Sequence, residues 1–267
     1  MKFIVEKEEG TGLIKTILPR QNYVVRQSPR KKHNLHLLAS NIDQAIIYMT
    51  VTQPKLKQGF IDRFLLTTET HNIPSYIIVN KSDIYTEDDM AIYNGLKQLY
   101  AEIGYETILV SAETGDGIDY LKEVLKDKTT LLSGHSGVGK SSIVNTIQED
   151  LELDTQEISD YSGKGMHTTT FAQMHELEFG GQLIDTPGIK EMGFINMDPV
   201  DVAHNFREIF KTSEHCKFGD CMHLNEPECA VKEAIELGRI SILRYQSYVS
   251  IVEDVMGQNS WERQTDG

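Results

Sequence analysis

The chain has 267 residues, of which 39% are hydrophobic and 25% are charged, so a packed core is expected and wholesale disorder is excluded. The formal net charge of -14 argues against non-specific nucleic-acid binding driven by overall attraction, because such binding neutralises phosphates with Lys and Arg, but it leaves room for a local basic patch. No apolar run is long enough to span a bilayer and no signal peptide opens the chain, which predicts a cytoplasmic protein without membrane contact.

The first 40 residues predict β structure. Apolar and polar residues alternate in FIVE and NYVVRQ, and Gly10 and Gly12 mark a turn between these stretches. We expect a short antiparallel hairpin here, which is too small to be an independent domain.

From Asn41 the pattern changes to that of an α/β domain. The stretches AIIYMTV, SYIIVN, ETILVSA and TTLLSG are near-continuous apolar runs, as in buried parallel strands. Amphipathic segments at residues 60–70 and 88–103 lie between them and predict helices. Alternating strands and helices predict a mainly parallel sheet, and we assign residues 41–199 to this domain.

A guanine-binding loop is predicted directly after the strand SYIIV, at Asn80, Lys81 and Asp83. The Asp83 carboxylate can accept two hydrogen bonds from the ring N–H and the exocyclic amine of guanine, which adenine does not offer as a pair. Lys81 can lie along the purine plane, and Asn80 can join this loop to a phosphate-binding loop. The alternative is a plain turn, since Asn, Ser and Asp all favour turns.

The next strand, ETILV, supports the guanine interpretation. It is followed by Ser111 and Ala112, in a sequence that resembles the GTPase loop whose backbone N–H contacts the guanine carbonyl. Two base-side motifs at the carboxyl ends of neighbouring strands agree with the usual place of ligands in α/β sheets.

A phosphate-binding loop of the form GxxxxGK[ST] follows the strand TTLLS and leads into a predicted helix. Its backbone N–H groups and the helix N-terminus favour phosphate oxygens. Lys140 is expected to reach the β- and γ-phosphates, and the Ser141 hydroxyl to ligate Mg²⁺. The predicted nucleotide contacts are Gly134, His135, Ser136, Gly137, Val138, Gly139, Lys140, Ser141 and Ser142.

Two further segments have the character of switch loops. After the strand QLI, Asp185 is expected to hold Mg²⁺ through water, and the Gly188 N–H to sense the γ-phosphate. Upstream, the stretch KGMHTTT supplies several hydroxyls, of which Thr169 is our choice of Mg²⁺ ligand in the GTP-bound state.

The residue that orients the attacking water in Ras-like enzymes is missing. A Gln follows the switch glycine there, whereas this chain has Ile189, which cannot hydrogen-bond to water. His167 is the candidate replacement, because an imidazole titrates near neutral pH and can position or deprotonate water. A purely structural histidine is the alternative.

The 3 Cys residues predict a metal centre near the C-terminus, because an odd, clustered set is not a disulfide framework. Cys216, Cys221, His223 and Cys229 supply three thiolates and an imidazole, which suits a closed, structural Zn²⁺ site. His215 is a rival ligand. We expect one zinc ion to hold residues 200–267 together.

Residues 230–255 predict a helix that packs against this zinc module. Lys232, Arg239 and Arg244 are candidates for RNA contact, with a solvated helix face as the alternative.

The order of the motifs is permuted relative to ordinary GTPases, with the guanine-binding loop before the phosphate loop. The same sheet can form when a chain is cut and rejoined at surface loops. Because residues 185–188 then run directly into the C-terminal module, loss of the γ-phosphate can move that module.

This order, with KGMHTTT, DTPGIKEMG and the cysteine cluster, resembles the ribosome-small-subunit-dependent GTPases (the RsgA/YjeQ family) over nearly the whole chain. The resemblance implies an N-terminal OB barrel, a circularly permuted GTPase domain and a C-terminal zinc domain. It also implies GTP hydrolysis stimulated by the 30S subunit late in its maturation, with a switch-loop His as the proposed catalytic residue. Only the last part of a five-stranded barrel fits before Asn41, so residues 1–40 are expected to be a truncated OB segment.

The expected function is thus a GTPase that alternates between GTP and GDP states with Mg²⁺, contacts the 30S subunit and its 16S rRNA, and is monomeric. Its catalytic residues would be His167, Lys140 and Thr169. The alternative is a GTP-binding zinc module that docks to RNA with negligible catalysis. An ATPase is disfavoured by Asp83 and the loop at Ser111.

Overall fold

The computed structural model of the protein describes residues 3–8, 11–27, 35–148, 173–185 and 197–265. Its centre is a six-stranded sheet with the strand order β7-β6-β5-β8-β10-β9. All neighbouring pairs are parallel except β10 and β9, which are antiparallel at one edge. The strands are β5 (Gln44–Met49), β6 (Ser75–Val79), β7 (Glu106–Leu109), β8 (Thr129–Gly134), β9 (Gln173–Glu176) and β10 (Gln182–Asp185). The prediction of a mainly parallel α/β sheet is confirmed.

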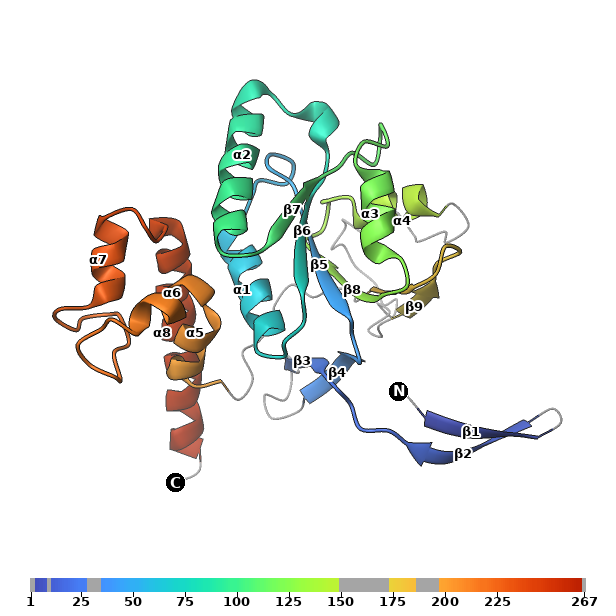
Figure 1. The fold of residues 1–267 in the computed structure, drawn as a ribbon, viewed down its shortest axis with the longest axis horizontal. Helices are drawn as coiled ribbons and strands as arrows, with labels where there is room; N and C mark the ends of the chain where they lie inside the picture. The colour runs from blue at the N-terminus through green and yellow to red at the C-terminus, as the bar shows by residue number, and fades with distance from the viewer. Residues whose placement is uncertain (1–2, 9–10, 28–34, 149–172, 186–196, 266–267) are drawn as a thin grey trace, which may run out of the picture.

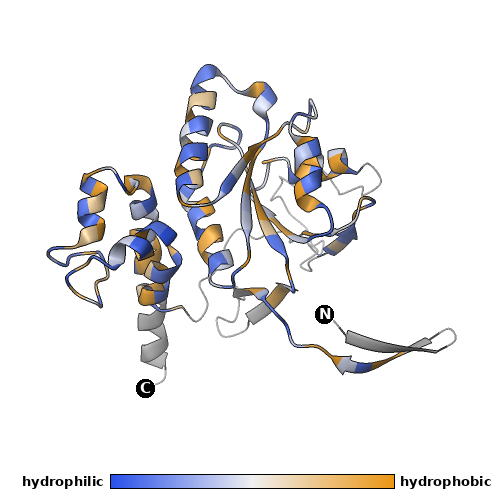
Figure 2. Cartoon of the chain, viewed as in Figure 1, coloured by the Kyte–Doolittle hydropathy of each residue, from blue (hydrophilic) through white to orange (hydrophobic). Residues whose placement is uncertain are grey.

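Helices cover the sheet on both faces (Figure 1). The strand β5 is buried along its whole length, and its side chains alternate between two apolar clusters. Ala45, Ile47 and Met49 pack with helices α1 (Gln58–Glu69) and α2 (Glu87–Glu102). Ile46 and Tyr48 pack with helices α3 (Ile118–Leu125) and α4 (Lys140–Ile147). A strand with apolar partners on both faces has no polar face, which explains its continuous apolar sequence. Figure 2 shows hydrophobic residues running through these central strands.

The two amphipathic segments expected at residues 60–70 and 88–103 are helices α1 and α2, which confirms both predictions. A capping box starts α2. The Thr86 hydroxyl accepts a hydrogen bond from the Asp89 backbone N–H at 3.2 Å, and the Asp89 carboxylate accepts one from the Thr86 N–H at 3.0 Å. A short 3-10 turn, η1 (Ser82–Ile84), separates this start from strand β6.

The N-terminal strands pair differently from the predicted single hairpin. Strand β1 (Phe3–Glu8) pairs with β2 (Thr11–Ile17), but NYVVRQ does not join them. Its strand β3 (Tyr23–Gln27) pairs with β4 (Leu35–Ser40), a segment to which the sequence pattern assigned no strand. The Asn22 side chain ties this second pair to the main sheet, through hydrogen bonds to the N–H and C=O of Ile42. The described N-terminal strands thus form two separate two-stranded sheets, and a truncated OB segment stays a prediction.

The C-terminal part is helical, as expected, and within the described residues no strand follows Pro199. Its helices are α5 (Pro199–Asn205), α6 (Arg207–Ser213), α7 (Ala230–Glu236) and α8 (Ile242–Thr265). The prediction of a single helix over residues 230–255 is wrong, because the helix is interrupted between α7 and α8. Gly238 adopts a left-handed φ of 69° there, which ends α7 in the manner of a helix C-cap. No described helix has both the length and the apolar character needed to cross a bilayer.

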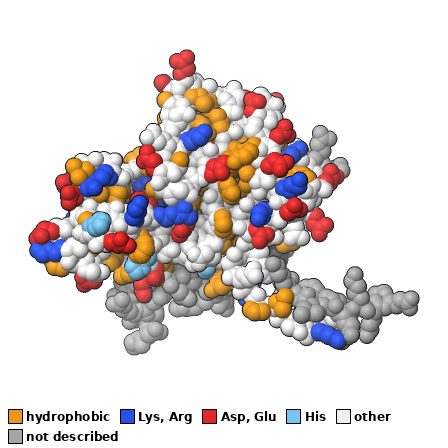
Figure 3. All heavy atoms as spheres, viewed as in Figure 1, with side chains coloured by type: hydrophobic (Ala, Val, Ile, Leu, Met, Phe, Trp, Pro, Cys, Tyr) orange, Lys and Arg blue, Asp and Glu red, His pale blue; other side chains and the backbone are white. Residues whose placement is uncertain are grey.

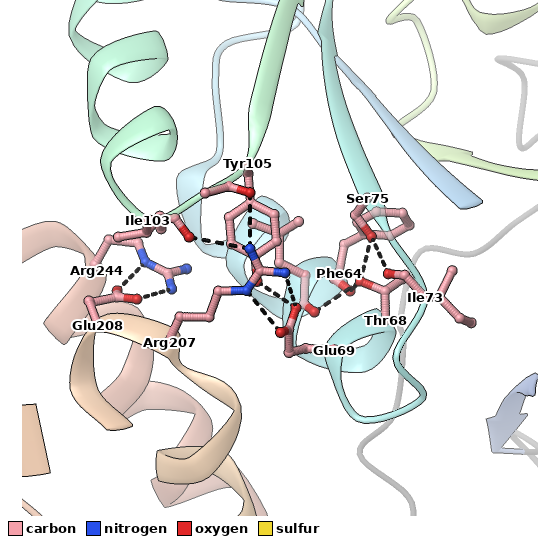
Figure 4. Close-up of polar contacts among 12 residues, drawn as sticks. Phe64, Thr68, Glu69, Ile73, Ser75, Ile103, Tyr105, Arg207, Glu208 and Arg244 are labelled. Carbon is pink, nitrogen blue, oxygen red and sulfur yellow. Dashed lines mark hydrogen bonds and ion pairs between the residues drawn. The ribbon is translucent and has the colours of Figure 1, made fainter. Parts of the chain in front are cut away.

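Arg244 joins the C-terminal helices to the sheet domain and is 2% exposed, so both surface interpretations of this residue are wrong. Figure 4 shows its contact with Glu208. Its guanidinium donates to Asp62 of α1 at 2.6 Å and to Glu208 of α6 at 2.7 and 3.1 Å. The Tyr100 hydroxyl also donates to Asp62, at 2.5 Å. Arg239, by contrast, is exposed.

A second, less buried contact lies beside it. Arg207 of α6 donates to both carboxylate oxygens of Glu69, at 2.8 and 2.9 Å, and its guanidinium lies 4.1 Å from the centre of the Tyr105 ring (Figure 4). Arg63 forms a further ion pair with Asp254 of α8. Helix α1 therefore carries acidic and basic partners for two different C-terminal helices.

Replacing Arg244 with Met is expected to destabilise the protein by about 3–5 kcal/mol, because the buried Asp62 carboxylate loses its counter-charge while the apolar stem is kept. Chemical unfolding followed by circular dichroism measures this. Arg239→Met is the matched control, since it removes an exposed arginine of the same module. Equal stability of the two variants would contradict the role assigned to the buried ion pair.

Candidate functional site

The candidate site lies where the parallel strands end. Register places Tyr48 of β5 beside Gly134 of β8, and Asp185 of β10 beside Leu132 of β8. On the other side, Val79 of β6 lies beside both Met49 and Leu109. The loops that begin at Asn80, Ser111 and Gly134 therefore share one edge of the sheet, where α/β folds bind ligands.

The phosphate loop connects β8 to α4. Two of its positions require glycine, because atoms of neighbouring segments lie where a Cβ would be. Gly134 has φ 155°, and a Cβ there would lie 2.7 Å from the Tyr48 carbonyl oxygen. Gly139 has φ 87°, and a Cβ there would lie 2.4 Å from the Asn80 amide nitrogen. Any side chain at either position would clash with β5 or with Asn80. The glycine pattern thus reflects packing against neighbouring strands as well as room for phosphate.

Asn80 holds three loops together and is 1% exposed. Its Nδ2 donates to the Val138 carbonyl at 2.9 Å, inside the phosphate loop, and its Oδ1 accepts from the Ala112 N–H at 3.2 Å. The amide therefore joins the predicted guanine-binding loop both to the phosphate loop and to the loop after β7. Thr146 of α4 adds a link by donating to the Ala112 carbonyl at 3.1 Å.

Asp83 and Ser111 also lie together. The Ser111 hydroxyl donates to Asp83 Oδ1 at 2.5 Å, which fixes the orientation of a carboxylate that is itself exposed. An exposed carboxylate with a fixed orientation can accept the paired donors of a guanine ring. Lys81 lies near Gly139 of the phosphate loop, with its Cε 4.0 Å from the Cβ position there, and its Nζ donates to the Gln53 carbonyl at 2.7 Å.

Lys140 begins α4, and its Nζ donates to the Gly134 carbonyl at 3.2 Å, which holds the ammonium at the phosphate loop. Ser141 and Ser142 occupy the first turn of the same helix. His135 points to the other side of the loop, where its ring lies 3.9 Å from the ring of Phe60 on α1. Of the remaining loop residues, Ser136 and Gly137 are exposed, and Val138 is buried.

Asp185 ends β10 next to the phosphate-loop strand. Burial, and then the nearby Asp185 carboxylate, raise the pKa of the Tyr48 phenol well above its ordinary value, so Tyr48 stays neutral beneath the loop. His167, Thr169 and Gly188 lie outside the described residues, as does Ile189. Their predicted roles therefore stay predictions.

A candidate metal centre lies in the C-terminal module. One ligand atom from each of Cys216, Cys221, His223 and Cys229 falls within 4.8 Å of all the others. His223 Nδ1 is 3.6 Å from the Cys216 sulfur and 3.5 Å from that of Cys229. His215, the rival ligand, is exposed and belongs to no metal-binding group found among the described residues.

The donor set fits a divalent cation. Burial is the main cause that raises the pKa of the Cys221 thiol to about 12, and the Cys229 thiol beside it adds to the rise. Burial disfavours the charged thiolate form of these cysteines. A bound cation would supply the opposite charge and stabilise the thiolates. The loop between them is held by Glu226, which accepts hydrogen bonds from the backbone N–H groups of Met222, Leu224 and Asn225.

Helix α8 supports this centre from outside. The Tyr245 hydroxyl donates to the His223 carbonyl at 2.6 Å, and the Tyr248 hydroxyl donates to the Met222 carbonyl at 2.8 Å. The same helix carries Arg244, so the metal loop and the contact with α1 share one support.

Sequence reasoning missed several residues that shape the nucleotide edge. Residues 50–57, between β5 and α1, approach both Lys81 and Gly137. The Tyr85 hydroxyl hydrogen-bonds to Val51 of this segment and to Asn80. No motif marks these positions, since their partners are mostly backbone atoms. The local feature that could have predicted a turn in residues 50–57 is the proline of Gln53-Pro54.

Comparison with known proteins agrees with this geometry. A family model described as RsgA GTPase matches residues 17–195. The chain is 47% identical over 251 residues to the small ribosomal subunit biogenesis GTPase RsgA of Bacteroides fragilis, covering 94% of this chain and 81% of that protein. It is 45% identical to the protein of the same name from Flavobacterium psychrophilum, covering 91% and 74%.

Two solved structures are similar over most of the chain. One is the crystal structure of YjeQ from Thermotoga maritima, with a TM-score of 0.78 and 35% identity over 95% of this chain and 82% of that one. The other is YloQ, described as a circularly permuted GTPase, with a TM-score of 0.76 and 28% identity over 96% and 79% of the two chains.

Proposed function

The chain belongs to the RsgA GTPase family, and from this premise we propose that it hydrolyses GTP in the biogenesis of the small ribosomal subunit. The names of its relatives state that role for those proteins. As a member of the family the chain is a P-loop GTPase with a circularly permuted fold. The proposal extends this to action on the 30S particle late in its maturation, through contact with 16S rRNA.

The observation that carries the proposal is the position of Asn80. Its two hydrogen bonds bring the guanine-binding and phosphate-binding loops to one edge, although the chain reaches them in reversed order. Asp83, oriented by Ser111, supports a preference for guanine over adenine, because a site built for paired donors rejects a base that lacks them.

We assign the phosphates to the loop from Gly134 to Ser142. Backbone N–H groups and the N-terminus of α4 would bind the phosphate oxygens, and Lys140 would balance charge that develops on the β–γ bridge. Ser141 and Asp185 are the residues that would hold Mg²⁺, which when bound neutralises charge on the β- and γ-phosphates.

The water-activating and switch roles are assigned to residues outside the described part of the chain. We propose that His167 positions the attacking water, that Thr169 ligates Mg²⁺ in the GTP state, and that the Gly188 N–H senses the γ-phosphate. Residue chemistry supports the assignment of His167, because an imidazole can hydrogen-bond to water whereas Ile189, which follows the switch glycine, cannot.

For the C-terminal centre we propose Zn²⁺, held by Cys216, Cys221, His223 and Cys229. Three thiolates and one imidazole without an open position suit a structural zinc site. We place it in a module of residues 200–267, after a GTPase domain of residues 41–199 and an N-terminal segment of residues 1–40.

The remaining assignments concern surroundings and partners. We propose a cytoplasmic, monomeric protein. On the face drawn in Figure 3, Asp and Glu side chains are interspersed with Lys and Arg side chains, which favours local rather than global attraction to RNA. Arg239 and Lys232 remain candidates for such a contact, whereas Arg244 does not because it is buried.

The purified protein is expected to release phosphate from GTP over many turnovers and at least about a hundredfold more efficiently than from ATP, because Asp83 reads guanine. Added 30S subunits are expected to raise the rate, and 50S subunits serve as the control. A rate that is equal for the two nucleotides would contradict the guanine assignment, and no response to 30S subunits would contradict the ribosomal one.

His167→Ala is expected to leave GTP affinity unchanged and to lower turnover by about a hundredfold, because the variant lacks the group that positions water. Equilibrium binding and single-turnover hydrolysis separate the two quantities. His215→Ala, which removes an exposed histidine of the C-terminal module, is the control. An unchanged single-turnover rate would remove His167 from the mechanism.

One zinc ion per chain is expected by elemental analysis, and a chelator is expected to lower the melting temperature, because zinc would cross-link the ligand loops and add to the small apolar core of the module. Cys229→Ser is expected to lose the metal and the same stability. His215→Ala should keep both, since His215 lies outside the cluster. A Cys229→Ser protein with full zinc content would contradict the ligand set.

A further inference from the structure

Tyr85 occupies a position that the functional assignment leaves unexplained. It directly follows the turn η1 and directly precedes Thr86, whose capping box with Asp89 starts α2. Its side chain is half-buried beside the guanine-binding loop. Burial is the main cause that raises its pKa to about 12, so the hydroxyl keeps its proton at neutral pH.

The hydroxyl makes two hydrogen bonds to backbone atoms of different segments. It donates to the Asn80 carbonyl at 2.6 Å and accepts from the Val51 N–H at 2.8 Å. Val51 belongs to residues 50–57, which connect β5 to α1, and we name this segment the β5–α1 loop. One phenol thus joins the guanine-binding loop to the β5–α1 loop.

The bond to the Asn80 carbonyl acts on a strained residue. That carbonyl belongs to the peptide unit between Asn80 and Lys81, whose orientation sets φ of Lys81. This φ is 70°, in the left-handed region, which costs a non-glycine residue about 1–3 kcal/mol and persists only where the surroundings hold it. Tyr85 supplies such a constraint on one side of the peptide unit.

The β5–α1 loop holds the same residue from the other end. The Lys81 Nζ donates to the Gln53 carbonyl at 2.7 Å. The loop is closed on itself, since the Thr50 hydroxyl donates to the Pro54 carbonyl at 2.6 Å and the Leu56 N–H donates to the Val51 carbonyl at 2.9 Å. Lys81 is therefore held at its backbone through the Asn80 carbonyl and at its ammonium by the β5–α1 loop. Tyr85 hydrogen-bonds to both of these segments.

We propose that the Tyr85 hydroxyl is a positioning group for guanine recognition, which fixes the peptide before Lys81 and with it the direction of Asp83. This rests on the proposed function, since it concerns the same guanine-binding loop. Tyr85 acts through Asn80 and Lys81 and is not itself assigned a contact with the nucleotide. Its loss should weaken recognition of the base more than hydrolysis.

Binding of GDP, inosine diphosphate and ADP to the full-length protein tests this, because inosine lacks the exocyclic amine that Asp83 is expected to read. Tyr85→Phe is expected to lower GDP affinity about tenfold, since two hydrogen bonds are lost. Inosine diphosphate should lose less, so that the preference for GDP over it shrinks. The KM for GTP should rise more than kcat falls.

Tyr120→Phe is the matched control, because the Tyr120 hydroxyl donates to Glu106 at 2.6 Å on the surface, outside the site. If wild type prefers GDP to ADP and Tyr85→Phe binds like Tyr120→Phe, the positioning role is overturned while the proposed function stands. If wild type shows no preference for GDP, both are overturned. Equal losses for GDP and inosine diphosphate would indicate general loosening and also overturn the positioning role.

A second measurement needs no variant. Because Tyr85 joins the two loops, GDP binding should slow hydrogen exchange at the Val51 amide of the wild-type protein. Exchange at Val51 that is the same with and without GDP would overturn the proposal even if Tyr85→Phe failed to fold.

Discussion

The arrangement of the loops at the carboxyl end of the sheet depends on the hydrogen bonds of the Asn80 side-chain amide. Buried polar groups need partners, and this one amide pairs with a carbonyl of the phosphate loop and with an N–H of the loop after β7. The glycine at position 139 is needed because the amide lies where a Cβ would be. The loops proposed to recognise the base and to bind the phosphates are therefore parts of one packed structure.

Helix α1 extends this structure toward the C-terminal module. Its Phe60 ring packs at a tilt of 33° against the ring of His135 in the phosphate loop. Asp62, further along the same helix, forms the buried pair with Arg244. Such a pair adds little to stability compared with apolar packing, but it allows few alternative arrangements of the two helices. The phosphate loop and the C-terminal helices thus both contact the same helix, α1.

Helix α8 has the matching role on the other side. It presents Arg244 to α1, and through Tyr245 and Tyr248 it holds the carbonyls of the metal-binding loop. The short helices α5, α6 and α7 bury apolar residues in one cluster with α8 and with Cys221 and Cys229, so their arrangement relies on α8 and on the cysteine cluster. The candidate metal centre and the contact with the GTPase domain consequently depend on the same helix.

The parallel sheet, the helices α1 and α2, and the loops that carry Asn80, Asp83 and Lys140 could be predicted from residue patterns, because buried strands and phosphate loops impose local patterns. The cysteine cluster could be predicted in the same way. The folded chain was needed to show that NYVVRQ pairs with residues 35–40, that Arg244 is buried against Asp62, and that Tyr85 joins two loops. These depend on partners far along the chain or on backbone atoms, and neither leaves a periodic or motif-like trace in the residues themselves.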